Sequence, residues 1–271
     1  MKRRKSILAS FLVMAILLIS QSLSAQEGPQ KQKTNSFWLD FGTGLGLVNH
    51  YDNGVIPYNI VGVNYNARLG FTDEWKRCHI RFEGGFFKSA IVEPEGNTYG
   101  VNLDLEFLYS CLQNKGRWHF WSGGNVRSFN DLHLIPKLEN NQAALSMFGS
   151  IGAVELVQCD FAYDKAKKHP WLTAYLKFSL PLVGIASRPG FAYLHDDEEV
   201  LEFFAIILSG HETFAKAFPG CTTDIGLTLN LRNGNRIGIS YYWDYFTTGK
   251  KGIYHYDNAY HNINLSFMFK I

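Results

Sequence analysis

Five charged side chains at alternating positions in three neighbouring stretches are the first candidates for chemistry. They are Arg68, Arg81, Glu83, Asp104 and Glu106. If the hairpins close at their most obvious turns, Arg68 lies opposite Arg81, Glu83 lies near Glu106, and Asp104 lies one step further along. Such a group could line a selective pore or form a proton-active carboxylate pair, because like carboxylates interact strongly in a confined site. We favour a simpler interpretation, in which an ion-pair network fills a narrow interior.

Ser240 and Asp244 form a second candidate site, because they share one face of a predicted strand. A hydrolase would also need a histidine, and His255 and His261 lie across the next hairpin. The alternation of side chains puts His261 on the opposite face, together with Ile263, which spoils a triad. A hydrolase acting on lipid or peptide, such as a protease with carboxylates and a histidine, remains an alternative that no motif supports.

Neither a metal site nor a bound cofactor is predicted. The nine histidines show no HExxH motif or other ligand spacing. The segment Gly42-Thr43-Gly44-Leu45-Gly46 superficially resembles a phosphate-binding loop, but no helix and no Lys-Ser/Thr pair follow it. Glycines at alternate positions instead indicate that another group packs closely against one face of a strand.

Strands of about ten or more residues must position these side chains, since apolar and polar residues alternate over most of the chain. In the clearest case Ile263, Leu265, Phe267 and Phe269 alternate with mostly polar neighbours. The alternation and the turn residues predict ten strands. These are 36–49, 58–71, 78–92, 99–112, 117–128, 143–163, 171–184, 221–232, 236–246 and 259–271.

Composition excludes several classes of protein. Of the 271 residues, 46% are apolar, 15% aromatic and 18% charged, which is incompatible with a disordered chain. Beyond residue 25 no uncharged apolar run approaches the ~18 residues of a membrane-spanning helix. Without residues 1–25 the chain has 22 basic and 24 acidic residues, a net charge of −2. A basic footprint for nucleic acid is therefore missing, and no nucleic-acid partner is expected.

The first 25 residues have the pattern of a secretory signal peptide. Four basic residues precede an apolar stretch, which ends in the small-residue sequence Ser22-Leu23-Ser24-Ala25. Residues 26–35 are polar and lack periodicity, so we interpret them as a periplasmic leader. Residues 36–271 then form the folded domain.

The linkers between predicted strands alternate in length, and this alternation indicates the topology of the sheet. They are short after every second strand and tend to be longer after the others, notably at 129–142, 185–220 and 247–258. An even number of antiparallel strands with this asymmetry is typical of a transmembrane β-barrel with both termini in the periplasm. Hydrocarbon cannot satisfy free backbone groups, so the sheet must close on itself, with apolar side chains facing lipid. The alternative is a soluble β-sandwich or a lipocalin-like barrel, whose strands are usually shorter.

Over residues 36–271 the chain resembles the broad family of outer-membrane β-barrel proteins of Gram-negative bacteria. The resemblance rests on the signal peptide, the strand pattern and the closing segment Asn262–Ile271, which is similar to the terminal signal for outer-membrane assembly. That signal usually ends in Phe or Trp, whereas this chain ends in Ile271. The resemblance implies an outer-membrane location, contact with outer-membrane lipid, and the assembly machinery as a partner during insertion.

Two segments do not fit regular strands. Residues 143–163 are long, and their apolar positions change parity between 151–153 and 154–156, which indicates a bulge. Within 185–220, four acidic residues at 196–199 precede an apolar pattern of helical spacing that ends at Gly210, which predicts a short helix in a long extracellular loop. If 202–208 were instead a strand and 143–163 were split, the barrel would have twelve strands.

Three functions are compatible with this architecture. The favoured one is a non-enzymatic barrel with a largely filled lumen, whose extracellular loops bind a protein or ligand. The alternatives are a small, porin-like passive channel, suggested by the polar lumen, and an outer-membrane hydrolase with Ser240 and Asp244 near its rim.

Overall fold

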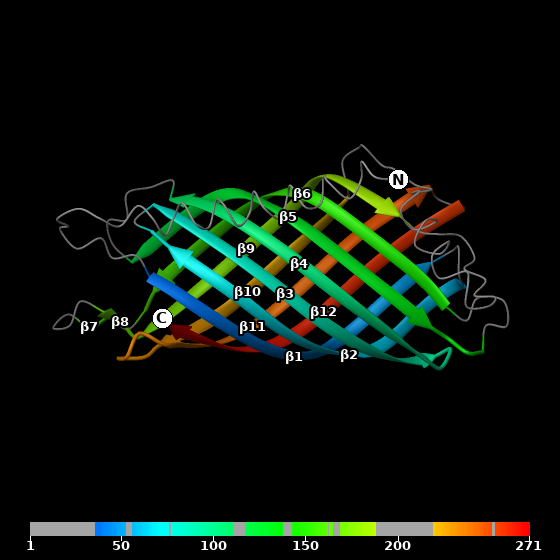
Figure 1. The fold of residues 1–271 in the computed structure, drawn as a ribbon, viewed down its shortest axis with the longest axis horizontal. Coiled ribbons are helices and arrows are strands. Elements are labelled where there is room, and N and C mark those ends of the chain that lie inside the picture. Colours follow the sequence, from blue (N-terminus) through cyan, green and yellow to red (C-terminus); the bar gives the residue numbers. More distant parts are fainter. Residues whose placement is uncertain are drawn as a thin grey trace, which may run out of the picture. The chain divides into compact units, whose positions relative to one another are not determined.

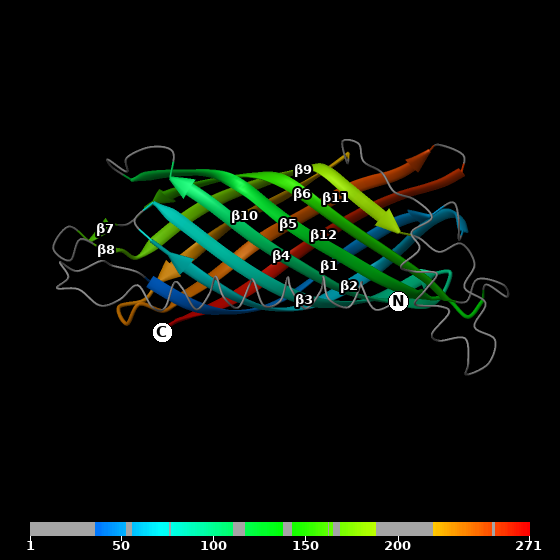
Figure 2. The same ribbon diagram turned by 45° about the horizontal axis from the view of Figure 1, so that its top comes forward.

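Ten long antiparallel strands close into one barrel in the computed structural model of the chain (Figures 1 and 2). The structure describes residues 36–52, 56–75, 77–110, 117–137, 143–161, 163–164, 169–187, 219–250 and 253–271. The barrel strands are β1 (Ser36–Asp52), β2 (Ile56–Glu74), β3 (Cys78–Glu93), β4 (Gly96–Ser110), β5 (Trp118–Leu134), β6 (Ala143–Asp160), β9 (Leu172–Ser187), β10 (Gly220–Asn230), β11 (Arg236–Lys250) and β12 (Ile253–Lys270). Between β6 and β9, the two-residue strands β7 (Tyr163–Asp164) and β8 (His169–Pro170) form a separate small sheet.

The barrel closes where its first and last strands meet. β1 pairs with β12 from Trp38 opposite Lys270 to Asp52 opposite Tyr256, and its other side pairs with β2. Closure leaves no free strand edge, so each strand is hydrogen-bonded on both sides. We call the end at which β1 begins and β12 finishes the terminal end, and the opposite end the far end.

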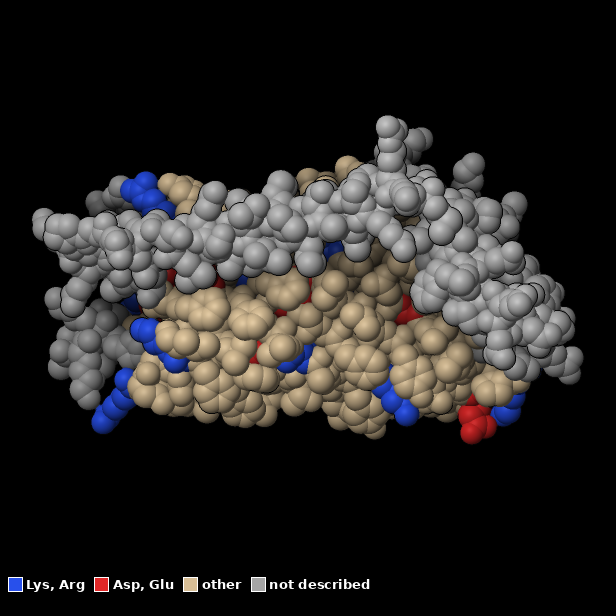
Figure 3. Space-filling view, viewed as in Figure 1, with Lys and Arg blue, Asp and Glu red and all other residues tan. Residues whose placement is uncertain are grey.

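The two faces of the wall have opposite chemistry. Outward-facing Leu265 is 41% exposed, whereas its inward-facing neighbour Asn264 is 2% exposed. The same alternation runs along most of the wall, and few charged residues interrupt the face seen in Figure 3. A soluble sandwich or lipocalin-like barrel would bury Leu265 and Phe267 in a central core, so that alternative is wrong.

The number of strands agrees with the prediction, but the connections differ. Residues 129–134, 247–250 and 253–258 belong to strands rather than to long loops, so a single long linker remains, between β9 and β10. Most barrel strands have 15 to 19 residues, more than the roughly ten that cross a bilayer. The wall therefore extends beyond the thickness of a membrane.

The two irregular segments have different outcomes. Residues Ala143–Asp160 form a single strand, β6, whose register against β9 shifts between Ile151 and Gly152, close to the predicted bulge. The barrel has ten strands, so the twelve-stranded alternative is wrong. The predicted helix after residue 196 lies outside the described residues, as do the predicted signal peptide and leader. In the described part of the chain, no helix has the length and apolar character needed to cross a membrane.

An arginine on the outer wall tests which solvent the wall meets. We expect Leu265→Arg to reduce the free energy of unfolding by about 2–4 kcal/mol in lipid vesicles, because the charge must enter hydrocarbon. The matched control is Val92→Arg, which lies on the outward face near the far end of β3 and should cost about 0–1 kcal/mol. Urea titrations of protein refolded into vesicles measure both values. Equal costs at the two positions would contradict a lipid-facing wall at Leu265.

Candidate functional site

The middle of the lumen contains paired charges from strands close together in the barrel. Arg81 of β3 lies 3.0 Å from Asp40 of β1 and also contacts Glu83. Arg68 of β2 lies 3.5 Å from the same glutamate. All four side chains are largely shielded from solvent, so each charge depends on its neighbours for compensation.

The register of the β2–β3 hairpin corrects one sequence expectation. Arg68 lies opposite Gly85 rather than opposite Arg81. β3 begins at Cys78 as predicted, but β2 continues beyond its predicted end at residue 71, and Glu74 pairs with His79, so the turn is shorter than expected. Moving the turn changes every partner along a hairpin, which is why the predicted pairing is wrong here.

The β3–β4 hairpin places one acid opposite another and a base opposite an acid. Glu83 lies directly opposite Asp104, with Glu106 one side-chain period away from that partner, and Arg81 lies opposite Glu106. Glu106 also contacts Lys177 of β9, which lies across part of the lumen. Asp104 accepts a hydrogen bond from Asn125 Nδ2 at 3.1 Å. The carboxylates therefore have basic or amide partners from several strands.

One bidentate ion pair in the lumen involves a residue that the sequence did not single out. Arg127 of β5 binds Asp244 of β11 through two hydrogen bonds, Nη1 to Oδ1 at 2.7 Å and Nη2 to Oδ2 at 2.6 Å. Thr222 of β10 donates to the same Oδ1 at 2.8 Å. This bidentate geometry holds the carboxylate of Asp244 within the lumen and not near the rim of the barrel, where the sequence predicts it.

Ser240 lies four residues from Asp244 on the inward face of β11, where both are buried. His261, considered as their partner, faces the other way: its Nδ1 lies 2.6 Å from the hydroxyl of Tyr241 on the outer wall. Asp244 is engaged by Arg127 instead. The structure therefore does not bring Ser240, Asp244 and His261 together.

The glycines of segment 42–46 make room for amide side chains that cross over β1. Asn64 Nδ2 of β2 donates to Asn262 Oδ1 of β12 at 2.7 Å, although β1 lies between the two strands. A Cβ on Gly44 would overlap the side chain of Asn264. Close packing is thus what these glycines permit, as their alternation predicted.

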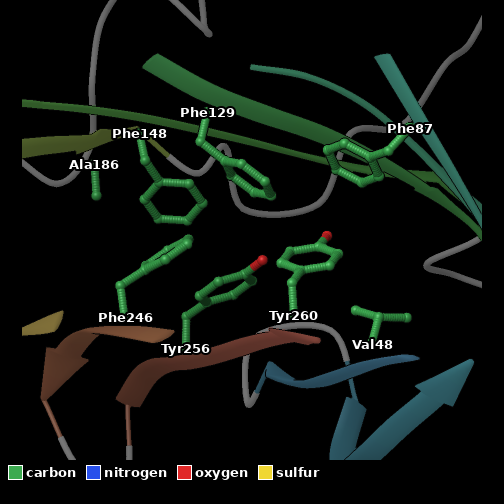
Figure 4. Close-up of a cluster of buried hydrophobic side chains, with 8 residues drawn as sticks. All are labelled: Val48, Phe87, Phe129, Phe148, Ala186, Phe246, Tyr256 and Tyr260. Carbon is green, nitrogen blue, oxygen red and sulfur yellow. The ribbon is translucent and has the colours of Figure 1, made fainter. Parts of the chain in front are cut away.

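A cluster of apolar side chains blocks the far half of the lumen. We call it the aromatic plug; its members are Val48, Phe87, Phe129, Phe148, Ala186, Phe246, Tyr256 and Tyr260. Figure 4 shows that they come from opposite walls and point toward one another. The ring centroids of Phe129 on β5 and Tyr260 on β12 are 5.5 Å apart, although these strands lie on opposite sides of the barrel. The plug therefore spans the whole lumen.

A smaller apolar cluster lines the terminal half. Leu108, Trp121, Val154 and Leu156 come from the adjacent strands β4, β5 and β6, and Tyr175 packs against them. The parity change in segment 151–156 has its origin here, because Val154 and Leu156 turn apolar side chains inward while Glu155 faces outward. Sequence reasoning detected the irregularity but not that it fills the lumen.

Two small cavities lie beside these groups among the described residues. One cavity, lined partly by Arg127, Phe148 and Asp244, has a volume of about 20 Å³. Another, lined partly by Asn66 and Tyr242, has a volume of about 50 Å³. Cavities of this size hold one or a few water molecules.

Comparisons with known proteins identify the fold. No family model matches the chain, and a search of curated proteins found no match. The outer membrane protease OmpT from Escherichia coli is similar with a TM-score of 0.53 and 8% identity, covering 89% of this chain and 99% of that one. The translocator domain of the autotransporter NalP from Neisseria meningitidis has a TM-score of 0.38 and 11% identity, covering 97% of each chain. The toluene transporter TodX from Pseudomonas putida has a TM-score of 0.32 and 9% identity, covering 89% of this chain and 90% of that one.

At these identities the likeness concerns the fold and not the activity. The match to OmpT extends over almost the whole of both chains. It agrees with the closed ten-stranded barrel and its apolar outer wall. The chain therefore has the fold of the outer-membrane β-barrel proteins of Gram-negative bacteria.

Proposed function

We propose that this protein is a closed outer-membrane barrel that conducts no small solutes and acts by binding a protein or ligand at its far end. The observation that carries the proposal is the aromatic plug. Its side chains belong to seven of the ten strands, distributed around the circumference of the barrel. A continuous wet path, which a passive channel requires, would have to pass through these packed rings.

Distances within the plug support a closed lumen. The rings of Phe148 and Phe246 are 4.8 Å apart between centroids, and those of Phe148 and Tyr256 are 4.9 Å apart. Ring pairs at these separations are in direct contact, which leaves no room for water between them. On the terminal side of the plug, the bidentate pair of Arg127 and Asp244 crosses part of the lumen. Two successive layers thus oppose the passage of solutes.

The proposal includes an orientation. The long linker between β9 and β10 joins these strands at the far end. Barrels of this fold have longer loops on the outside of the cell and short turns on the periplasmic side. We therefore place the far end outside the cell and the termini in the periplasm, with the linker 188–219 among the segments offered to a partner.

Conductance measurements test the closed lumen. In planar bilayers we expect the purified protein to show no discrete current steps, because the plug excludes hydrated ions. The variant Phe129→Ala/Phe148→Ala/Phe246→Ala removes three rings and should introduce steps, which shows that the assay detects an opened barrel. Discrete steps in the unaltered protein would contradict the proposal and favour the porin-like alternative.

A further inference from the structure

Next to the aromatic plug, two histidines and an aspartate converge from different walls. His50 lies two residues before the far end of β1, and Asp131 and His133 lie one side-chain period apart on β5. All three are buried, with exposures of 0%, 1% and 2%. We propose that His50, Asp131 and His133 form a binding site for one divalent transition-metal ion of the Zn²⁺ class.

The positions of the donor atoms support a shared ion. One ligand atom from each of the three residues lies within 4.8 Å of the others. His133 Nε2 and Asp131 Oδ2 are 3.5 Å apart. Two ligands on a tetrahedral zinc ion are about 3.4 Å apart, given metal–ligand distances of about 2.0–2.2 Å. That pair already has the required spacing, and a movement of roughly an ångström by His50 would complete the group.

In each imidazole, the ring nitrogen that points away from the proposed ion has a hydrogen-bond partner. The Nδ1 of His133 lies 2.8 Å from the hydroxyl of Thr98, so its Nε2 faces the aspartate. The Nε2 of His50 lies 3.2 Å from the hydroxyl of Tyr260. A metal-bound histidine normally has such a partner on its second nitrogen, because the partner fixes the tautomer and the direction of the ring.

Tyr256 places a second oxygen beside this group, as a fourth polar atom. Its hydroxyl donates to Asp131 Oδ2 at 2.8 Å and lies 3.5 Å from His50 Nδ1. This places Nδ1 of His50 on the side that faces the carboxylate. Two imidazole nitrogens and a carboxylate oxygen form a donor set that suits Zn²⁺, Ni²⁺ or Co²⁺ and not Mg²⁺ or Ca²⁺, which prefer oxygen ligands only.

The carboxylate of Asp131 can also accept a further ligand or hydrogen bond. Asp131 Oδ1 is buried, and among the described parts of the chain it has no hydrogen-bond partner. A buried carboxylate oxygen without a partner is costly, and a bound cation removes that cost. A metal ion here would tie β1 to β5 across the lumen and close the far side of the plug.

Zinc binding to the full-length chain tests this site. The protein is produced without a polyhistidine tag, refolded in detergent, treated with a chelator and dialysed against Zn²⁺ alone. We expect one zinc per chain by elemental analysis, and a rise in melting temperature because the ion binds the folded state only. Mg²⁺ in place of Zn²⁺ should give neither effect. Absence of stoichiometric zinc in the unaltered protein would overturn the proposal.

Variants locate the site. His50→Gln and His133→Gln should each weaken zinc binding at least about tenfold and abolish the rise in melting temperature. The matched control is His119→Gln: that histidine lies 3.0 Å from Asp160 at the terminal end, so it has an aspartate partner but lies far from the proposed site. Unchanged zinc binding in both site variants, or its loss in the control, would contradict the assignment. The conductance test does not depend on this result.

Discussion

Replacing Asp244 with alanine should reduce the free energy of unfolding by about 3–5 kcal/mol, because the guanidinium of Arg127 would stay buried without its counter-charge. The side chains of Arg127 and Asp244 are 15% and 2% exposed, so water can replace little of the lost interaction. Thr222 would also lose the acceptor for its hydroxyl. Urea titrations of protein folded in detergent measure the loss.

Two further variants distinguish pairing from simple packing. The double variant Arg127→Met/Asp244→Leu removes both charges, and we expect it to be clearly more stable than Asp244→Ala, since an apolar pair leaves no charge uncompensated. The pair Lys137–Glu95, 3.4 Å apart but 67% and 80% exposed, is the surface control, and Glu95→Ala should change stability little. If Asp244→Ala behaved like Glu95→Ala, the ion pair would contribute little to the fold.

The strands could be predicted because lipid constrains every second residue on the outer wall. Outward positions such as Leu265 and Ile239 must be apolar over the whole membrane-crossing length, so the pattern survives in a single sequence. Predicted and observed strands agree in number and overlap along their length. The pattern cannot define the turns equally well, because residues such as Glu74 are polar whether they lie in a strand or in a loop.

Several strands were predicted too short at the point where the inward side chains change from polar to apolar. Three predicted boundaries, at residues 128, 246 and 259, coincide with plug residues Phe129, Phe246 and Tyr260. In the plug an inward residue is as apolar as its outward neighbours, so the contrast that indicates a strand disappears. Beyond residue 246 the contrast is missing for another reason, because Thr247 and Thr248 are polar on both faces of the strand.

Contacts across the lumen could not be predicted from local spacing. Arg127 and Asp244 are 117 residues apart, and His50 reaches the residues of β5 only because the sheet closes. Barrel closure determines which distant strands face each other, and closure depends on registers that were uncertain at β2–β3. The pair at positions 131 and 133 was the one local signal for the proposed metal site, and alone it resembles any acid–base pair on a strand.

The plug should also contribute strongly to stability, with Phe129 at its centre. Its ring lies 5.3 Å from that of Phe87, 5.5 Å from those of Phe246 and Tyr260, and 6.2 Å from that of Phe148, measured between centroids. Phe129→Ala should cost about 3–5 kcal/mol, because rigid opposing walls cannot collapse into the cavity. Equilibrium unfolding in urea measures this value.

Phe267 on the outer wall is the matched control for Phe129. It is 38% exposed toward the surroundings of the barrel, where mobile lipid or detergent chains fill the space that a smaller side chain leaves. Without a lasting cavity, Phe267→Ala should cost clearly less than Phe129→Ala. Phe129→Leu should recover much of the loss, since it restores most of the apolar volume. Equal costs for Phe129→Ala and Phe267→Ala would mean that the plug packs no more tightly than the lipid-facing wall, and the case for a closed lumen would then fail.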